Sequence, residues 1–293
     1  MSLSHGSLKL GCPIWAHASW RGKFFTANAA RTDFLPQYAS VFSTSEGNST
    51  FYGLPTPEVV ARWAAEAPDS FCFCFKFPRT ITHELQLIDA QNPTAEFMDR
   101  IRPLEGRLGP FFLQLHASFG PQQLKVLDSY LSDLPRSHSY AIEVRHPDFF
   151  VPGRAAENLI ALLVSHGVEW VNFDTRGLFA SQADDSWTRD AKRKKPNLPL
   201  IINSLTKTPF VRFVGDTVIE QNDRILEFWA DKVVAWLREG RSPYFFTHHP
   251  DDTYAPALAR RFHGFVRARR PALDPLPPFP IERDLGGRQM ALF

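Results

Sequence analysis

Cysteine is scarce in this chain of 293 residues, which contains only 3 cysteines. They are Cys12, Cys72 and Cys74, and apolar residues surround them. An odd, small number of cysteines argues against a disulfide framework and fits a reducing compartment, so we expect a cytoplasmic protein. Cys72 and Cys74 do not form a redox CxxC motif, and we expect small buried side chains. The alternative for Cys12 is a thiol nucleophile.

Long apolar runs and a large net charge are also missing. No run approaches the roughly 20 residues that span a bilayer, so we expect no membrane partner. The start, MSLSHGSLKLG, lacks the cationic and hydrophobic regions of a signal peptide. The formal net charge is +2, which excludes a global attraction to nucleic acid.

The common short catalytic motifs are absent as well. The sequence contains no HExxH, no G-x-S-x-G elbow and no G-x-x-x-x-G-K-[ST] phosphate loop. We therefore predict no cofactor and no resident metal. A divalent metal remains an alternative because N and O ligands occur at His83, His116, Glu143, His146, Asp174, His248 and His249.

Short apolar runs alternate with helix-like stretches along most of the chain. Hydrophobic residues make up 44% of the sequence, and 26 residues are Phe. The alternation predicts a parallel sheet, and eight strands favour a (β/α)8 TIM-like barrel of the α/β class, which commonly needs about 250 residues. The runs lie near 8–15, 38–48, 71–77, 111–116, 140–146, 168–174, 210–214 and 244–249.

Two segments depart from this alternation. Residues 177–208 are polar, contain RDAKRKKP and are predicted to form a loop excursion. Residues 271–280 read PALDPLPPFP, which cannot be helical. We therefore divide the chain into a TIM-like barrel domain over 8–270 and an extended proline-rich C-terminal arm over 271–293.

Strand alternation predicts which polar side chains enter the barrel. Side chains two residues apart share a face, so Phe71, Phe73, Phe75 and Phe77 should cover the outside while Lys76 points inward. The same rule groups ionisable side chains at the C-terminal ends of the strands, where barrel enzymes work. The predicted rim consists of Glu46, Lys76, Gln114, Glu143, Arg145, Asp174, Arg212 and His248.

Five ordered segments resemble the DUF72 family, also called YecE-like, of TIM-barrel proteins. They are WRGKFF at 20–25, EGNSTFYGLP at 46–55, the stretch from Trp63 to Pro68 with FCFKFPRTITH ending at His83, LGPFFLQLHASF at 108–119 and AIEVRHPDFF at 141–150. The resemblance implies a (β/α)8-like barrel but no established reaction. It also implies that a shared cleft contains Glu46, Asn48, Lys76, His83, Gln114, Glu143, Arg145 and His146.

The last strand departs from the family pattern. It reads FFTHHPDDTY, where the family more often has Asn-rich text. The roles of His248 and His249 therefore stay open. By alternation, the two imidazoles cannot both point inward.

The rim suggests an enzyme that acts on a small anionic or phosphorylated substrate, as a hydrolase, lyase or isomerase. Glu46 and Glu143 would be the acid and base, and Lys76 a proton shuttle, Schiff-base amine or anion clamp. Arginine offers a planar fork for a phosphate or carboxylate. The predicted substrate-binding residues are Asn48, His83, Gln114, Arg145, His146, Asp174 and Arg212.

Plainer interpretations stand beside this one. The rim charges would equally suit a structural ion-pair network or a non-catalytic ligand-binding barrel. A basic run in the excursion would be either a solvated loop or a phosphate contact; it comprises Arg189, Lys192, Arg193, Lys194 and Lys195. Aromatic residues near the first two strands would line a pocket or pack in the core; they are Trp15, Trp20, Phe24, Phe25, Phe51 and Tyr52.

The C-terminal peptide suggests a different function. It reads QMALF and resembles the Q-[LM]-x-L-F peptide by which bacterial DNA polymerases and repair proteins dock on the sliding clamp. A tethered terminal segment with apolar anchors can bind a partner in this way. The alternative to the enzyme is thus an accessory DNA-transaction protein with partner-binding residues Gln289, Met290, Leu292 and Phe293.

Overall fold

Parallel strands alternating with helices form the structure, as the sequence predicts. The computed structural model describes residues 6–290, with side chains through residue 285. All paired strands run parallel, which confirms the α/β class. The strands are β1 (Lys9–Gly11), β2 (Thr44–Gly47), β3 (Cys72–Phe75), β4 (Phe111–Gln114), β5 (Tyr140–Glu143), β6 (Glu169–Trp170), β7 (Asn172–Asp174), β8 (Phe210–Val214) and β9 (Tyr244–His248).

The strands form three sheets rather than one continuous ladder. Their orders are β1-β9-β8-β7, β2-β3 and β4-β5-β6. The predicted strand over 168–174 is divided at Val171 into β6, which pairs with β5, and β7, which pairs with β8. No closed barrel ladder is present among the described residues, so closure stays a prediction.

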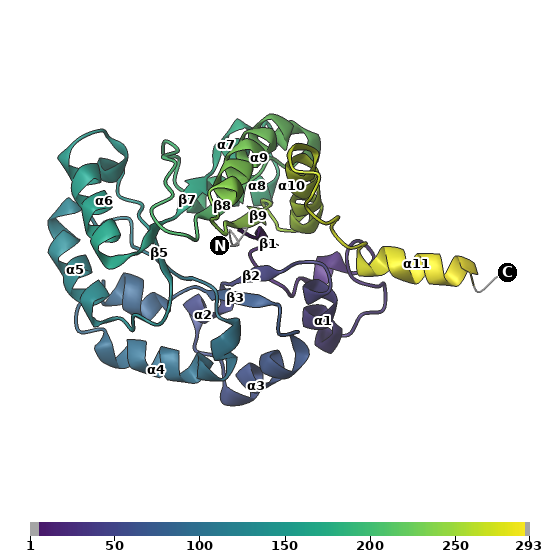
Figure 1. Ribbon diagram of the computed structural model, residues 1–293, viewed down its shortest axis with the longest axis horizontal. Coiled ribbons are helices and arrows are strands. Elements are labelled where there is room, and N and C mark those ends of the chain that lie inside the picture. The colour runs from purple at the N-terminus through teal and green to yellow at the C-terminus, as the bar shows by residue number, and fades with distance from the viewer. Residues whose placement is uncertain (1–5, 291–293) are drawn as a thin grey trace, which may run out of the picture.

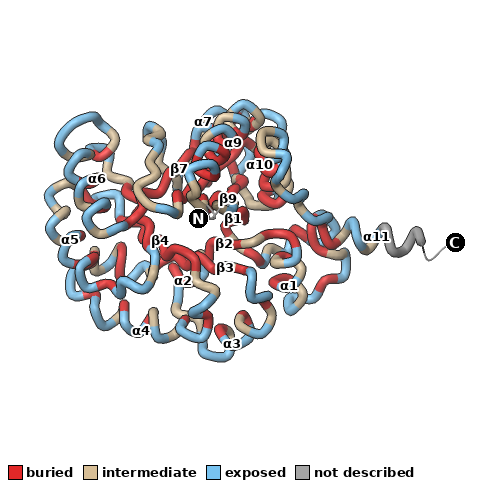
Figure 2. Tube along the Cα trace, viewed as in Figure 1, coloured by how far each residue is buried: buried red, intermediate tan, exposed pale blue. Residues whose placement is uncertain are grey.

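Helices surround the central strands (Figure 1). Buried residues are concentrated along the strands, and exposed residues lie mainly on the surrounding helices and loops (Figure 2). Within residues 6–290, no helix has both the length and the apolar character of a membrane span. The helices are α1 (Phe34–Ala39), α2 (Ser49–Tyr52), α3 (Pro57–Glu66), α4 (Gln91–Ile101), α5 (Leu124–Asp133), α6 (Arg154–His166), α7 (Arg176–Ala180), α8 (Ser186–Lys194), α9 (Asp223–Arg238), α10 (Ala255–Arg269) and α11 (Pro280–Met290).

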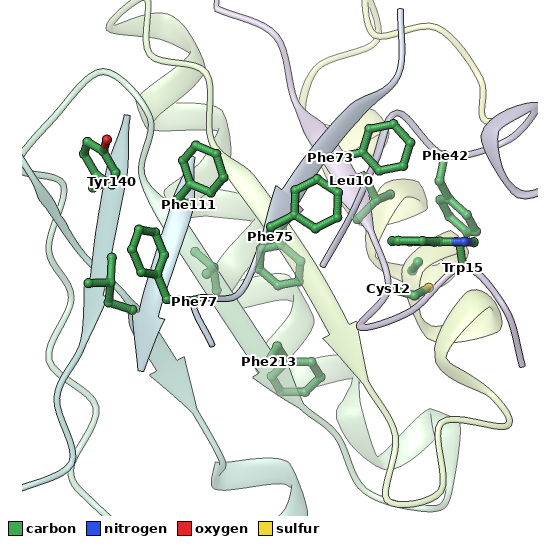
Figure 3. Packing of buried hydrophobic residues seen from close by; sticks show 14 of the residues in the cluster. Leu10, Cys12, Trp15, Phe42, Phe73, Phe75, Phe77, Phe111, Tyr140 and Phe213 are labelled. Atoms are coloured by element: carbon green, nitrogen blue, oxygen red, sulfur yellow. The ribbon is translucent and has the colours of Figure 1, made fainter. Parts of the chain in front are cut away.

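The two faces of β3 bury different sets of side chains. Phe73 and Phe75 stack with ring centroids 5.5 Å apart in the large core beneath the helices (Figure 3). Cys74 faces a smaller inner cluster, which also contains Phe112, Ala141, Val171, Phe210, Tyr244 and Phe246. The predicted division into a phenylalanine face and a cysteine face is therefore confirmed.

The predicted orientation of β7 is wrong. Val171 belongs to the inner cluster and Phe173 packs against it, so the even-numbered residues face away. Asp174 instead accepts a hydrogen bond of 2.7 Å from the Trp229 indole of α9. Trp170 also packs in the large core beneath the helices, so the alternation holds across Val171 and the prediction assigned the wrong face.

A close approach of two strands positions Glu46. A Cβ on Gly11 would lie 2.0 Å from the Thr44 carbonyl oxygen, so only glycine fits where β1 meets β2. Just beyond this point, the Glu46 amide donates to the Cys12 carbonyl at 3.1 Å. The first and second segments are thus joined beside the predicted site.

Two other expectations about the elements need correction. The strand predicted over 38–48 begins only at Thr44, because α1 continues through Ala39. The predicted loop over 177–208 contains α8, whose first amides are capped by the Asp185 carboxylate. The two Asp185 bonds to Trp187 and Thr188 amides are 2.9 Å each.

The C-terminal arm is not extended throughout. Residues 271–279 form no helix or strand, as predicted, but Pro280–Met290 form α11. Proline suits the first turn of a helix, and Glu282 accepts from the Phe279 amide at 2.7 Å. Phe279 also packs on Phe24 with ring centroids 4.8 Å apart, which fixes the residue before α11 to the body.

Candidate functional site

Ionisable side chains converge at the C-terminal ends of several strands. Glu46 and Glu143 lie near the ends of β2 and β5, Arg212 lies on β8 and His248 ends β9. Lys76 follows β3 directly. Hydrogen bonds join these groups, so we call Glu46, Lys76, Gln114, Glu143, Arg145, Arg212 and His248 the rim network.

Arg212 is the centre of the rim network. Its Nε lies 2.7 Å from Glu46 Oε1 and its Nη2 lies 3.1 Å from Glu46 Oε2. Its Nη1 donates to Glu143 Oε2. The guanidinium also lies over the rings of Phe112 and Phe173, at 5.0 and 5.2 Å. One buried cation therefore neutralises carboxylates from two separate sheets.

Both carboxylates stay ionised at neutral pH. Burial alone would raise their pKa values, but nearby cations outweigh that effect. Arg212 and His248 hold the pKa of Glu46 well below its ordinary value. Arg212, Arg145 and Lys76 lower the pKa of Glu143 to about 2. Neither group therefore holds a proton that it could donate near pH 7.

A second branch of the network leads from Glu143 to Lys76. Arg145 Nε and Nη2 each lie 2.8 Å from Glu143 Oε1. The Gln114 carbonyl oxygen then accepts from Arg145 Nη2 at 2.8 Å and from Lys76 Nζ at 2.9 Å. Gln114 thus holds two cations beside each other without neutralising either.

Lys76 is the unusual member of the rim network. Its ammonium lies 3.6 Å from the centre of the Phe51 ring, and only 7% of the residue is exposed. Among residues 6–285, Lys76 forms no ion pair with a carboxylate. Burial, together with repulsion from Arg212 and Arg145, lowers its pKa to about 7, although Glu143 and Glu46 oppose the shift.

Other predicted residues lie around this centre. Asn48 Nδ2 donates to Glu46 Oε2 at 2.9 Å. His83 packs edge-on against Phe51, and burial followed by the Lys76 charge lowers its pKa to about 4. His146 accepts from the Asp148 amide and, within residues 6–285, forms no hydrogen bond or ion pair with the rim network. The first two residues are therefore brought to the site, and His146 is not.

Two of the earlier hypotheses, a rim position for Asp174 and a nucleophilic Cys12, do not fit the structure. Asp174 is bonded to Arg176 and Trp229 rather than to the rim network, so its predicted place in the rim is wrong. Among the described residues, no three His, Cys, Asp or Glu side chains are grouped as a metal site. Full burial also raises the pKa of the Cys12 thiol far above its usual value, which opposes a nucleophilic role.

The two histidines at the end of β9, His248 and His249, point in different directions, as alternation predicts. His248 Nε2 lies 3.1 Å from Glu46 Oε1 and so joins the rim network. His249 Nδ1 instead lies 2.5 Å from Asp251 Oδ1. The first histidine supports Glu46, and the second organises the loop after β9.

Three participants were missed or left open by the sequence analysis. Phe51 and Phe173 provide the aromatic faces beneath Lys76 and Arg212. Lys195 follows α8, and the Pro196 carbonyl accepts from Thr175 just beyond β7 at 3.1 Å. Burial lowers the pKa of Lys195; Asp252 opposes the shift, whereas Arg212 and Arg145 add to it. Assigning the odd-numbered residues of β7 to the inner face would have placed Phe173 beside the rim network. No local sequence signal marks the position of Lys195.

A pocket of about 480 Å³ lies against one side of the rim network. Glu46 and Asn48 contribute to its lining, together with residues from the loop after β1, from α1 and from α3. Trp15 and Trp63 form part of its walls. The pocket therefore connects the ionic centre with an aromatic surface.

We expect Arg212→Met to lower the free energy of unfolding by about 3–5 kcal/mol at pH 7, because two buried carboxylates lose their shared cation. The loss should be smaller at pH 4. In the wild type, ionised Glu46 and Glu143 stabilise the fold above their unfolded pKa, and this stabilisation is lost as the pH falls toward their lowered folded pKa. Without Arg212, the two buried carboxylates accept protons at a higher pH. Urea unfolding at both pH values measures the difference.

The matched control is Arg189→Met, which removes an exposed ion pair with Asp184. We expect this variant to remain within about 0.5 kcal/mol of the wild type. Equal losses for the two variants, or a loss for Arg212→Met that does not change between pH 7 and pH 4, would contradict a shared buried cation.

Comparison with known proteins agrees with this architecture. The family model described as "Protein of unknown function DUF72" matches residues 9–282. UPF0759 protein YecE of Escherichia coli, in strain K12 and in O157:H7, is 37% identical over 276 residues, covering 94% of this chain and 98% of the relative.

Two solved structures share the fold. A DUF72 family protein (TM1631) of Thermotoga maritima has a TM-score of 0.68 at 21% identity, over 89% of this chain and 99% of that one. A DUF72 family protein (EF0366) of Enterococcus faecalis has a TM-score of 0.66 at 19% identity, over 90% and 99%. By its match to the family model and its identity to YecE, this chain belongs to the DUF72 family.

Proposed function

We propose that the protein is an enzyme that binds a small anionic or phosphorylated molecule beside Lys76 and Arg145. The observation that carries this proposal is the buried Lys76 ammonium, which has no carboxylate partner among residues 6–285. Burying a cation without such a partner costs free energy, and a bound anion would recover it. Lys76 and Arg145 keep 7% and 16% exposure, so a small anion can reach both side chains.

The charges around Lys76 support an anion rather than a cation as ligand. The three cations Lys76, Arg145 and Arg212 face the two carboxylates Glu46 and Glu143, which leaves one positive charge in excess. Lys195 also lies within the field of Arg212 and Arg145, although the Asp252 carboxylate offsets part of its charge. A phosphate or carboxylate bound at this position would neutralise the excess positive charge.

The roles proposed for the carboxylates change with this geometry. Glu46 and Glu143 are both held by Arg212 and remain ionised, so they support the arginine rather than act as acid and base. Lys76 has a pKa of about 7 and is the group suited to proton transfer near neutral pH. A partly neutral amine is also suited to nucleophilic attack on a carbonyl.

We also propose that the strand segments form a (β/α)8-like barrel with interrupted ladders. The Glu46 amide joins β2 to the end of β1. A parallel bridge between Lys76 and Phe112 joins the third segment to β4. Val171 links β6 and β7 along the chain and donates to the Ile142 carbonyl at 2.9 Å. These contacts support a ring of segments around the inner cluster.

Sulfate provides a test because its charge is constant between pH 6 and pH 9. We expect sulfate to raise the melting temperature at pH 6 and to bind more weakly as pH rises above about 7, where Lys76 loses its proton. Lys76→Met should weaken binding by about tenfold or more, since hydrogen bonds to charged groups contribute roughly 1.5–3 kcal/mol. Thermal shift at matched ionic strength measures the affinity.

The control is Lys125→Met, which removes an exposed lysine from α5. It should bind sulfate like the wild type. If Lys76→Met also binds sulfate normally, or if wild-type affinity is the same at pH 6 and pH 9, the anion does not bind at Lys76. Anion binding without turnover of any offered phosphate ester or carboxylate would favour the non-catalytic binding barrel.

We propose clamp docking as a second candidate function. Residues 291–293 lie outside the described residues, as do the side chains of Gln289 and Met290. The observation in its favour is that α11 projects from the body (Figure 1), which would make the QMALF peptide reachable by a partner. A bound sliding clamp would recognise Gln289 through hydrogen bonds and the apolar residues Met290, Leu292 and Phe293 through a pocket.

Deletion of residues 289–293 tests this second function. We expect the intact chain to bind a bacterial sliding clamp in surface plasmon resonance and the truncated chain to lose the signal, because the deletion removes every proposed anchor. The control is Glu239→Ala, which changes an exposed site on another part of the chain. Equal binding by the intact and truncated chains, or no binding by either, would overturn the proposal.

A further inference from the structure

We infer that the 480 Å³ pocket beside Glu46 is a binding site for a small molecule that carries a planar ring and a negative charge. Its volume lies within the range of roughly 300–1,000 Å³ found for small-molecule sites. It lies near the C-terminal ends of β1 and β2, the edge at which parallel α/β structures bind ligands. The site does not include Lys76, so it stands apart from the anion site proposed above.

The walls of the pocket suit a planar ring. Trp15 and Trp63 meet edge to face, with ring centroids 5.1 Å apart at 87°. Trp63 also stacks on Phe75 at 5.7 Å, and that phenylalanine is fully buried in the main core. Phe34 of α1 lines the pocket as well. Aromatic walls that are fixed by the core can receive a ring without the cost of ordering mobile side chains.

The inner end of the pocket provides a polar contact. Asn48 Nδ2 donates to the Pro13 carbonyl and to Glu46 Oε2, at 2.9 Å in each case. The amide nitrogen is therefore committed, and the Asn48 carbonyl oxygen is the atom that can accept from a ligand. Arg212 forms an ion pair with Glu46, and this pairing weakens the repulsion that the Glu46 carboxylate would exert on an anionic ligand.

The outer end of the pocket is cationic. Arg31 is exposed and forms no ion pair among residues 6–285. Arg62 Nε lies 3.9 Å from Glu66 Oε1, a long contact, and the arginine side chain is 55% exposed. Arg31, Arg62 and Glu66 line this end, and the charge of Asp33 acts on Glu66 from outside the lining. The two arginines favour a ligand whose ring enters the pocket and whose negative group stays beside them.

Two dyes of the same ring structure test both parts of this proposal. 8-Anilinonaphthalene-1-sulfonate carries a negative charge, and N-phenyl-1-naphthylamine has the same rings without it. We expect both dyes to gain fluorescence with the folded protein. The sulfonate should bind about three- to fivefold more tightly, the size expected for a partly exposed ion pair. Saturable titration at low ionic strength measures both affinities.

Variants that fill the pocket locate the dye. Ala18 and Ser49 both line it from exposed positions, so Ala18→Trp and Ser49→Trp should block it without disturbing the core. The matched control is Ala95→Trp, on an exposed position of α4. We expect each pocket variant to weaken both dyes at least about tenfold and the control to bind like the wild type. Unchanged binding in both pocket variants would overturn the site.

Charge variants test the anionic part. The double variant Arg31→Ala with Arg62→Ala should remove the preference for the sulfonate and leave the neutral dye unaffected, whereas the control Arg102→Ala, in an exposed ion pair with Asp99, should keep the preference. Equal affinity of the two dyes for the wild type would overturn the cationic role. Lys76→Met should bind both dyes normally, so a failure of the anion site beside Lys76 remains distinguishable from a failure of this pocket.

Discussion

One buried arginine joins the C-terminal ends of strands from separate sheets. Arg212 reaches from β8 to Glu46 on β2 and Glu143 on β5, strands that belong to three different sheets. Removing two carboxylates from water is costly unless a cation meets both, and the guanidinium meets them with separate nitrogens. Its position between the Phe112 and Phe173 rings restricts the geometry further. The arrangement of the strand ends therefore depends on this contact.

The same contact determines where reactivity can lie. Because Arg212 keeps Glu46 and Glu143 ionised, the carboxylates are poor proton donors at neutral pH. The positive charge that is left over falls on Lys76, which touches an amide oxygen and an aromatic face instead of an acid. The ring-lined pocket shares Glu46 with this network but faces Trp15 and Trp63. The rim network thus separates two different environments, the cationic surroundings of Lys76 and the aromatic pocket.

Much of this arrangement follows from strand periodicity, and its failures have local causes. The alternation in SFCFCFKFP places Lys76 with the small cysteines, and the structure agrees. The prediction for Asp174 fails because it assigned the wrong face of the strand: Trp170 packs in the large outer core, whereas Val171 and Phe173 face the inner cluster. The helices α8 and α11 carried readable signals, in the Asp185 cap and in Pro280 followed by Glu282, within segments rich in polar or proline residues. The position of Lys195 depends on a tertiary contact between Thr175 and Pro196, which no local pattern encodes.

The titration of the Lys76 side chain by NMR measures the pKa of this buried cation most directly, and Lys76→Met serves to assign its resonance. We expect a midpoint near pH 7, because burial and the neighbouring arginines oppose the charged form. A midpoint near the ordinary lysine value of about 10.4 would contradict it. Lys76 would then be an ordinary solvated or paired cation, and the excess charge at the strand ends would not be available to a ligand.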